Sequence, residues 1–177
     1  MTFSQISKPI SLKEKIMGDK ISIVISCKYD LEGHKKRIDF IKFIEKNSNL
    51  ELDIYGATNE FDFKNYKGQV PDNDKSKVLI PYKYHFNCEN YFIDNYITEK
   101  FNDAILCETF LFYGGPSNVV NIYPQHGYQL LDMNDFEKSM KMIENCISKN
   151  AFNLKNIREI KDIILYKNSF SHRIMKL

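Results

Sequence analysis

The sequence predicts an α/β fold: a parallel β-sheet covered by helices on both faces. Short segments rich in β-branched and aromatic residues alternate along the chain with segments of helical periodicity, which is the order of elements in βαβ units. The short segments are also apolar without interruption, as strands are when both faces of a sheet are covered. Sheets of this kind bind ligands where the strands end and the chain enters the helices.

Size and composition describe one ordinary globular domain. The chain has 177 residues, of which 43% are apolar and 27% charged, and this is enough for one well-buried core. A net charge of +2 is too balanced for a protein that coats nucleic acid or an anionic membrane. No apolar run approaches the roughly 20 residues of a membrane-spanning helix, and the N-terminus lacks the apolar core of a signal peptide.

The four cysteines are widely spaced, and each lies within an apolar segment. This pattern predicts buried reduced thiols rather than a disulfide framework or a zinc site with paired ligands. A reducing, cytoplasmic location is therefore expected. The cysteines are Cys27, Cys88, Cys107 and Cys146.

The chain is predicted to open with a lead-in, a strand and a helix. Residues 1–19 are polar and predict a lead-in with a short helical piece at Leu12–Met17. The β-branched run Ile21–Cys27 predicts a strand buried on both faces. Residues 34–47 predict the first long helix, because their apolar side chains form one stripe. These side chains are Phe40, Ile41 and Ile44.

A strand, a long connection and another strand are predicted next. Leu50–Gly56 predicts a strand that ends at a glycine. Residues 57–77 are polar and contain several turn-forming residues, so they predict an irregular excursion on the surface. The next strand is predicted at Tyr82–Cys88, because Pro81 would interrupt any ladder before it.

The remaining elements follow the same alternation. A helix is predicted to begin at Thr98, with Phe101, Ala104, Ile105 and Glu108 on one side. Strands are predicted at Thr109–Gly115 and Tyr128–Leu131. Residues 152–177 predict a helical tail in one or two pieces.

The clearest amphipathic helix is predicted to start at Asn134 and Glu137, which have the spacing of a capping box. Its apolar side chains recur at steps of four, three and four residues. They are Phe136, Met140, Ile143 and Ile147.

Residues suited to binding an anion gather at a predicted junction between strand and helix. The loop after Cys88 leads into the helix that begins with Glu99 and Lys100, where free N–H groups and the helix dipole favour negative charge. Glu99 could accept hydrogen bonds from two ribose hydroxyls. Asn90 could add a polar side chain that hydrogen-bonds the ligand, and Tyr96 an aromatic ring that packs against it. A charged first turn with a solvated lysine is an equally supported alternative.

The basic cluster HKKR, residues 34–37, lies at the opening of the first long helix, again after a strand. Arg37 could hold a diphosphate bidentately, although a solvated basic face is the better interpretation of the cluster by itself. The Gly-Gly-Pro sequence at residues 114–116 predicts a plain turn.

Metal binding is not predicted. His85 alternates with apolar residues and predicts a packed histidine, while His126 and His172 lack the spacing of metal ligands. Residues 132–135 contain two aspartates, but a helix cap explains Asn134 and Asp135 better.

The motifs YKYHFNCEN, NYITEKFNDAI and FLFYGGPSNV, followed by an Asp-Phe helix start, resemble the donor-binding half of family 10 glycosyltransferases, the α1,3/4-fucosyltransferases. The spacing from Asn90 through Tyr96 to Glu99 and Lys100 fits the family pattern without a gap, and Arg37 matches a family arginine in position. The resemblance covers roughly residues 20–150. Cys88 and Gly115 depart from the pattern.

The resemblance implies a Rossmann-like sheet that forms one half of a GT-B glycosyltransferase. It implies GDP-fucose as the donor, inverting transfer of fucose to a glycan hydroxyl, and no required metal. Arg37 and Lys100 would hold the diphosphate, Glu99 would bind the ribose, and Asn90 and Tyr96 would line the nucleotide-sugar pocket. Residues 20–150 would form the donor-binding domain, between the lead-in of residues 1–19 and a helical tail at residues 151–177.

Family members also carry a separate N-terminal domain that binds the acceptor and supplies the general base. No residue of this sequence can be named as that base, so a partner chain or a second copy could complete the cleft. Two alternatives stay open: a non-catalytic module that binds a nucleotide sugar, and a scaffold in which a degraded transferase fold survives.

Overall fold

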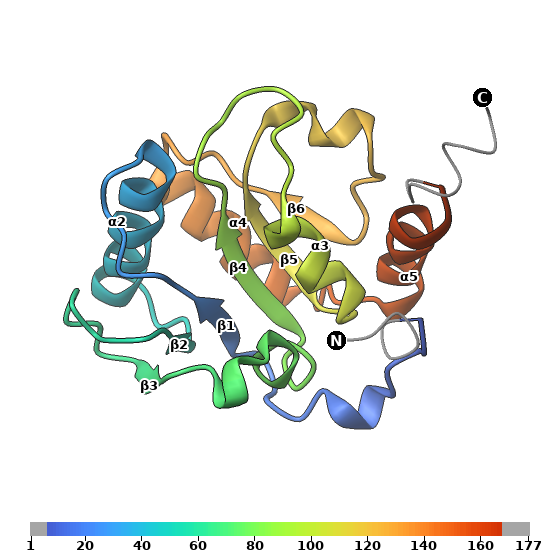
Figure 1. Ribbon diagram of the computed structural model, residues 1–177, viewed down its shortest axis with the longest axis horizontal. Coiled ribbons are helices and arrows are strands. Elements are labelled where there is room, and N and C mark those ends of the chain that lie inside the picture. Colours follow the sequence, from blue (N-terminus) through green and yellow to red (C-terminus); the bar gives the residue numbers. More distant parts are fainter. Residues whose placement is uncertain (1–6, 168–177) are drawn as a thin grey trace.

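The computed structural model describes residues 7–167 and shows one sheet between two helical layers (Figure 1). The six strands of this part of the chain are all parallel and lie in the order β3-β2-β1-β4-β5-β6. This is the strand order of the Rossmann fold, in which the order reverses between β1 and β4. The strands are β1 (Ile21–Val24), β2 (Leu52–Tyr55), β3 (Tyr66–Gly68), β4 (Tyr84–Cys88), β5 (Phe110–Gly114) and β6 (Tyr128–Leu130). The predicted α/β class is confirmed.

Helices cover both faces of this sheet. On one face lie α2 (Glu32–Asn47) and α4 (Phe136–Ser148), which contact each other. On the other face lie α3 (Glu99–Leu106) and α5 (Leu154–Asp162), which form a second contacting pair. Shorter helical pieces complete the chain: η1 (Leu12–Glu14), η2 (Pro71–Asn73), η3 (Lys75–Val78), η4 (Ser117–Asn121) and η5 (Ile163–Lys167).

The core is aromatic on both faces of the central strands. Successive strand side chains point to opposite faces, so neighbouring residues of β4 and β5 enter different layers. Toward α2 and α4, Phe86 meets Phe40 edge to face at 5.2 Å between ring centroids. Toward α3, Phe101 meets Tyr113 edge to face at 5.1 Å and stacks on Tyr123 at 4.8 Å. These two layers hold the carboxyl ends of the strands in place.

All five predicted strands are shorter in the structure than predicted, β1 and β4 among them. β1 ends at Val24 rather than at Cys27, because its partner β2 ends at Tyr55. The oxygen of Tyr55 accepts from Ile25 N (2.9 Å), just beyond the end of β1. β4 begins at Tyr84 rather than at Tyr82, whose N–H donates instead to Leu79 O (3.1 Å) at the end of η3.

The prediction of an irregular excursion over residues 57–77 is wrong at β3. This strand pairs with β2 through hydrogen bonds from Ile54 N to Asn65 O (3.1 Å) and from Gly56 N to Gly68 O (3.0 Å). As the edge strand, β3 has only one neighbour, and none of its side chains is fully buried. It therefore lacks the apolar pattern by which the other strands can be recognised.

Two predicted helix ends are also wrong. Glu108 does not lie on α3, which ends at Leu106, but follows it with a φ of 51°. Asp135 rather than Asn134 caps α4, by accepting from Lys138 N at 2.9 Å. The predicted capping box is therefore absent from this helix start.

The predicted cysteines and histidines lie in mixed environments. Three cysteines are buried free thiols, but Cys27 is partly exposed. His85 is buried as predicted, His126 pairs with Glu159 at 3.0 Å, and His172 falls outside the described residues. No helix of the described part of the chain is long and apolar enough to span a membrane.

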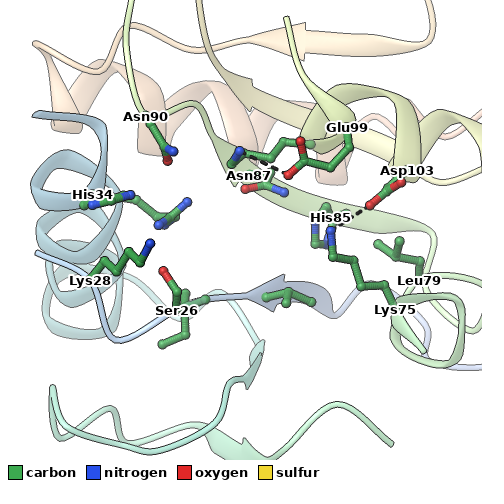
Figure 2. A pocket seen from close by; sticks show the side chains of 14 residues that line it. Ser26, Lys28, His34, Lys75, Leu79, His85, Asn87, Asn90, Glu99 and Asp103 are labelled. Atoms are coloured by element: carbon green, nitrogen blue, oxygen red, sulfur yellow. Dashed lines mark hydrogen bonds and ion pairs between the residues drawn. The ribbon is translucent and has the colours of Figure 1, made fainter. Parts of the chain in front are cut away.

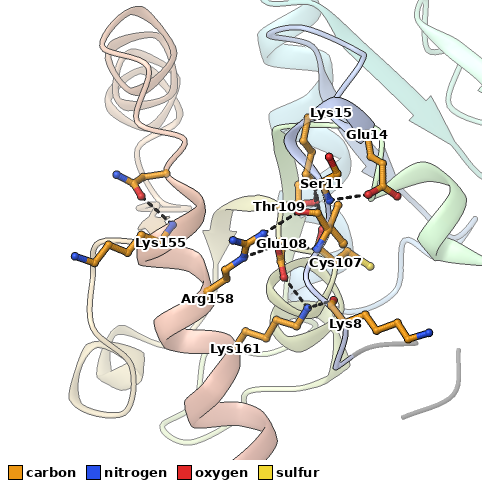
Figure 3. Close-up of polar contacts among 12 residues, drawn as sticks. Lys8, Ser11, Glu14, Lys15, Cys107, Glu108, Thr109, Lys155, Arg158 and Lys161 are labelled. Carbon is orange, nitrogen blue, oxygen red and sulfur yellow. Dashed lines mark hydrogen bonds and ion pairs between the residues drawn. The ribbon is translucent and has the colours of Figure 1, made fainter. Parts of the chain in front are cut away.

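Glu108 fastens the N-terminal segment to α5 (Figure 3). Its buried carboxylate accepts from Lys161 Nζ at 2.8 Å and from Arg158 Nε at 2.9 Å. It also accepts from Ile10 N at 3.2 Å, while Arg158 donates to Ile10 O at 2.8 Å. One carboxylate thus joins three segments that are far apart in the sequence.

Lys15 lies in the same region and makes the stability depend on pH. Its ammonium nitrogen is 3.0 Å from both Cys107 O and Thr109 Oγ1, and burial lowers the pKa of Lys15 from 10.5 to about 7. Between these pH values the unfolded chain binds more protons than the folded chain. The free energy of unfolding is therefore expected to rise above pH 7, by at most about 1.4 kcal/mol per pH unit.

Urea denaturation at pH 7.0 and 8.5 measures this rise in the wild type and in Lys15→Met. The variant removes the titrating amine, so its stability is expected to rise less over this interval. The thiols of Cys88 and Cys107, whose pKa burial raises to about 12, begin to oppose the rise near pH 8.5, where unfolded thiols ionise, but they do so in both proteins. An equal rise in both proteins would show that other groups cause it.

Candidate functional site

A cavity of about 260 Å³ lies at the carboxyl ends of β1 and β4, where the strand order reverses (Figure 2). Its walls come from the loop after β1, the first turns of α2, the segment around η3, the end of β4 and the start of α3. Open Rossmann sheets bind ligands at this switch point, so the cavity is the candidate binding site.

Helix α2 contributes two buried side chains to the cavity, His34 and Arg37. Residues three apart share one face of a helix, so Lys35 between them is exposed. Nη1 of Arg37 donates to Cys88 O at 3.1 Å, whereas its Nε is buried without a partner among the described residues. Burial lowers the pKa of Arg37, and a bound anion would oppose this effect.

Asn90 lines the same cavity and also carries a polar atom without a partner among the described residues. Its side-chain oxygen is buried and has no hydrogen-bond partner within residues 7–167. Its backbone oxygen accepts from Gly33 N at 3.0 Å. A Cβ atom at Gly33 would lie 1.7 Å from Glu89 O, so only glycine lets α2 approach the end of β4 this closely.

The start of α3 is held by the buried carboxylate of Glu89. It accepts from Thr98 N at 2.9 Å, from Thr98 Oγ1 at 2.7 Å and from Tyr113 OH at 3.0 Å. Lys100 Nζ lies 3.5 Å from the same carboxylate and 3.2 Å from Glu99 Oε1. Partial burial acts to raise the pKa of Glu99, but Lys100 holds it below its usual value.

Four of the five residues predicted for the site line this one cavity. They are Arg37, Asn90, Glu99 and Lys100. Tyr96 does not line it, because its ring packs edge to face on Tyr91 at 5.6 Å between centroids in the loop after β4.

Sequence reasoning missed several lining residues. Ser26 and Lys28 follow β1, His85 and Asn87 lie on β4, and Lys75 and Asp103 lie farther along the cavity. The position of Lys28 just after a buried strand was a usable signal. Lys75 carried none, because it lies in the polar connection that shows no periodic pattern.

His85 forms part of the cavity wall from within the sheet. Its Nδ1 lies 2.9 Å from Ser22 Oγ. Burial lowers the pKa of His85 to about 3, so the imidazole is neutral at physiological pH. A neutral ring in this position is suited to packing against a ligand rather than to binding an anion.

Across the part of the chain that the structure describes, no three or more His, Cys, Asp or Glu side chains are grouped as metal ligands would be. Residues 132–135 instead form the turn that leads into α4. There Asp132 Oδ1 accepts from Asn134 N at 3.0 Å, and Asp135 caps the helix.

The fold and the cavity define a class of protein: the chain has the architecture of one half of a GT-B glycosyltransferase. Residues 17–153 match the family model described as glycosyltransferase family 10 (fucosyltransferase) C-term. The chain belongs to this family, and the predicted resemblance is confirmed.

Solved structures agree on the fold. A crystal structure of an α1,3-fucosyltransferase is 24% identical with a TM-score of 0.61, covering 84% of this chain and 39% of its own. The structure of an α1,3-fucosyltransferase with GDP-fucose is 20% identical with a TM-score of 0.60, and the match covers 96% of this chain and 52% of that structure's chain. The crystal structure of TarM is 9% identical with a TM-score of 0.61, and the match covers 90% of this chain and 34% of the TarM chain.

The chain thus spans 39% to 52% of the length of these two fucosyltransferase structures. A comparison with curated protein sequences found no match.

Proposed function

We propose that this chain is the donor-binding part of a fucosyltransferase and that it binds GDP-fucose in the cavity between β1 and β4. The observation that carries the proposal is that Arg37 and Asn90 line one cavity and that each has a buried polar atom without a partner among the described residues, Arg37 Nε and Asn90 Oδ1. Buried polar groups in proteins nearly always have partners. A ligand that accepts from Arg37 and donates to Asn90 would satisfy both.

The charges of the cavity suit a diphosphate. Arg37, Lys28 and Lys100 come from two helices and a loop, and all three line it. The planar guanidinium of arginine binds phosphate oxygens through two parallel hydrogen bonds. The first turn of α3 adds the positive end of a helix dipole.

The ribose and the sugar are assigned from the same arrangement. Glu99 stands beside Lys100 at the start of α3 and is exposed to solvent, so its carboxylate is available to accept from two ribose hydroxyls. Tyr96 lies in the loop after β4 and outside the cavity lining, so we assign it to a part of the donor that projects beyond the cavity.

The proposed reaction is an inverting transfer. A glycan hydroxyl attacks C1 of the fucose, the bond from C1 to the diphosphate oxygen breaks, and GDP leaves with the electron pair. Arg37 and Lys100 would stabilise the negative charge that develops on the leaving diphosphate. The proton of the hydroxyl passes to a general base. We place that base and the acceptor on an opposing domain or partner chain, since this chain spans only part of the length of the fucosyltransferase structures.

Thermal denaturation with and without nucleotide tests the donor site. A ligand that binds only the folded state stabilises it by about 2.7 kcal/mol at a concentration 100 times its dissociation constant. GDP and GDP-fucose are therefore expected to raise the melting temperature, and guanosine much less. A melting curve that millimolar GDP leaves unmoved would contradict the proposal. Binding without transfer to any glycan in the presence of an acceptor domain would favour a non-catalytic nucleotide-sugar-binding module.

A further inference from the structure

The far end of the cavity carries a second set of polar groups. It is formed by Lys75 at the start of η3, by Leu79 at its end, by Asp103 on α3 and by His85 on β4 (Figure 2). We propose that this end binds the base of the nucleotide and that Asp103, together with Lys75, selects guanine. This inference rests on the proposed donor site and adds the residues that decide which nucleotide enters it.

The position of Asp103 follows from the helix on which it lies. Glu99 and Asp103 are four residues apart, so both side chains lie on one face of α3, about 6 Å apart along its axis. Figure 2 shows both side chains bordering the cavity. With Glu99 on the ribose, Asp103 lies one helical turn farther on, where the base attached to that ribose is expected.

Apolar and neutral groups make this end suitable for a flat ring. The buried side chain of Leu79 and the neutral imidazole of His85 both line it. Nδ1 of His85 is already paired with Ser22 Oγ, so only Nε2 is available to a ligand. These groups provide contact area for a base without selecting among bases.

The selective groups are Asp103 and Lys75, whose Oδ2 and Nζ atoms are 2.8 Å apart. Guanine presents two donors, N1–H and the 2-amino group, beside the acceptor O6, whereas adenine presents a donor at its 6 position. A carboxylate that accepts from both guanine donors, next to an ammonium that donates to O6, matches guanine and not adenine. Adenine would leave both charged groups poorly paired, and a site built for hydrogen bonds discriminates strongly against such a ligand.

The ion pair can open to admit a base at small cost. Lys75 and Asp103 are 44% and 35% exposed, and ion pairs this accessible to solvent contribute little to stability. A second cavity of about 330 Å³ adjoins the pair and shares Lys75, Leu79 and Asp103 with the first. The two side chains therefore have space to move apart around the edge of the ring.

A change of nucleotide preference in a variant of Asp103 tests the inference. Xanthosine diphosphate carries an oxygen at C2 where GDP carries the amino group, so it should suit an amide better than a carboxylate. Calorimetry on the wild type is expected to show a higher affinity for GDP than for either xanthosine diphosphate or ADP. Asp103→Asn is expected to weaken GDP about 10- to 150-fold, as loss of a charge-assisted pair does, and to shift the preference toward xanthosine diphosphate.

Two further variants make the result decisive. Asp162→Asn makes the same change at an exposed position of α5 and should leave every affinity unchanged. Lys75→Met retains the carboxylate, so it should weaken GDP without shifting preference toward xanthosine diphosphate. Because the readout is a ratio of two affinities, partial unfolding of a variant does not imitate it. An unchanged ratio in Asp103→Asn would overturn this inference alone, whereas a wild type that binds no nucleotide would overturn the proposed donor site as well.

Discussion

Replacing Arg37 with alanine is expected to weaken GDP binding about 10- to 150-fold, since a lost charge-assisted contact costs roughly 1.5–3 kcal/mol. The structure explains the direction. Nη1 of the guanidinium donates to Cys88 O, while Nε is buried without a partner among the described residues. Guanosine has no diphosphate, so its affinity should change little. Lys100→Ala should show the same difference between GDP and guanosine.

Calorimetry with both ligands measures this contrast, and Lys35→Ala is the matched control. Lys35 lies on the same helix with the same sign of charge, but it is exposed and does not line the cavity. Arg37→Lys keeps the charge and loses the planar fork, so an intermediate affinity is expected. GDP affinities that stay at the wild-type value in both alanine variants would contradict the assignment of Arg37 and Lys100 to the diphosphate.

Replacing Glu108 with alanine is expected to lower the free energy of unfolding by about 3–5 kcal/mol, because it leaves buried positive charge without its partner. The side chain of Lys161 is only 4% exposed and lies 2.8 Å from the carboxylate. Arg158 Nη2 lies 2.9 Å from the other carboxylate oxygen. The N-terminal segment would also lose its contact at Ile10 N.

Urea denaturation of matched variants separates this effect from simple loss of an ion pair. Glu159→Ala removes a glutamate whose partner is His126 on the surface, and exposed pairs of this kind contribute at most about 1 kcal/mol. Glu108→Ala combined with Lys161→Met should recover part of the lost stability. Comparable losses for Glu108→Ala and Glu159→Ala would mean that the buried cluster contributes no more than a surface pair.

The backbone conformation of Glu108 is further evidence that its side chain stabilises the fold. Its φ of 51° lies in the left-handed region, where a bulky side chain costs energy and glycine would be free of strain. Glu108→Gly relieves that strain but removes the carboxylate, so it should still destabilise. Asn150 also has positive φ, at 48°, but is exposed, and Asn150→Gly should be neutral or stabilising.

The sequence by itself determined the α/β class and the order of the main elements. The buried strand β5 is a continuous apolar run, and α4 repeats its apolar side chains with helical spacing. Both signals record which side chains an element buries, and they can be read from the sequence because this record lies in the spacing of residues within a single element. Arg37, Asn90, Glu99 and Lys100 could be named for the same reason, because each lies in a motif at a junction between strand and helix.

Only the tertiary structure decided which distant groups meet. Lys75 and Asp103 form an ion pair across 28 residues, and Glu108 binds Lys161 across 53. Tyr96 lies in a recognisable motif, yet packing against Tyr91 turns its ring away from the cavity lining. Strand β3 has too few buried side chains to show a pattern. In each case the deciding energy comes from burial and pairing between segments that the folded sheet brings together, and local sequence patterns contain no record of those contacts.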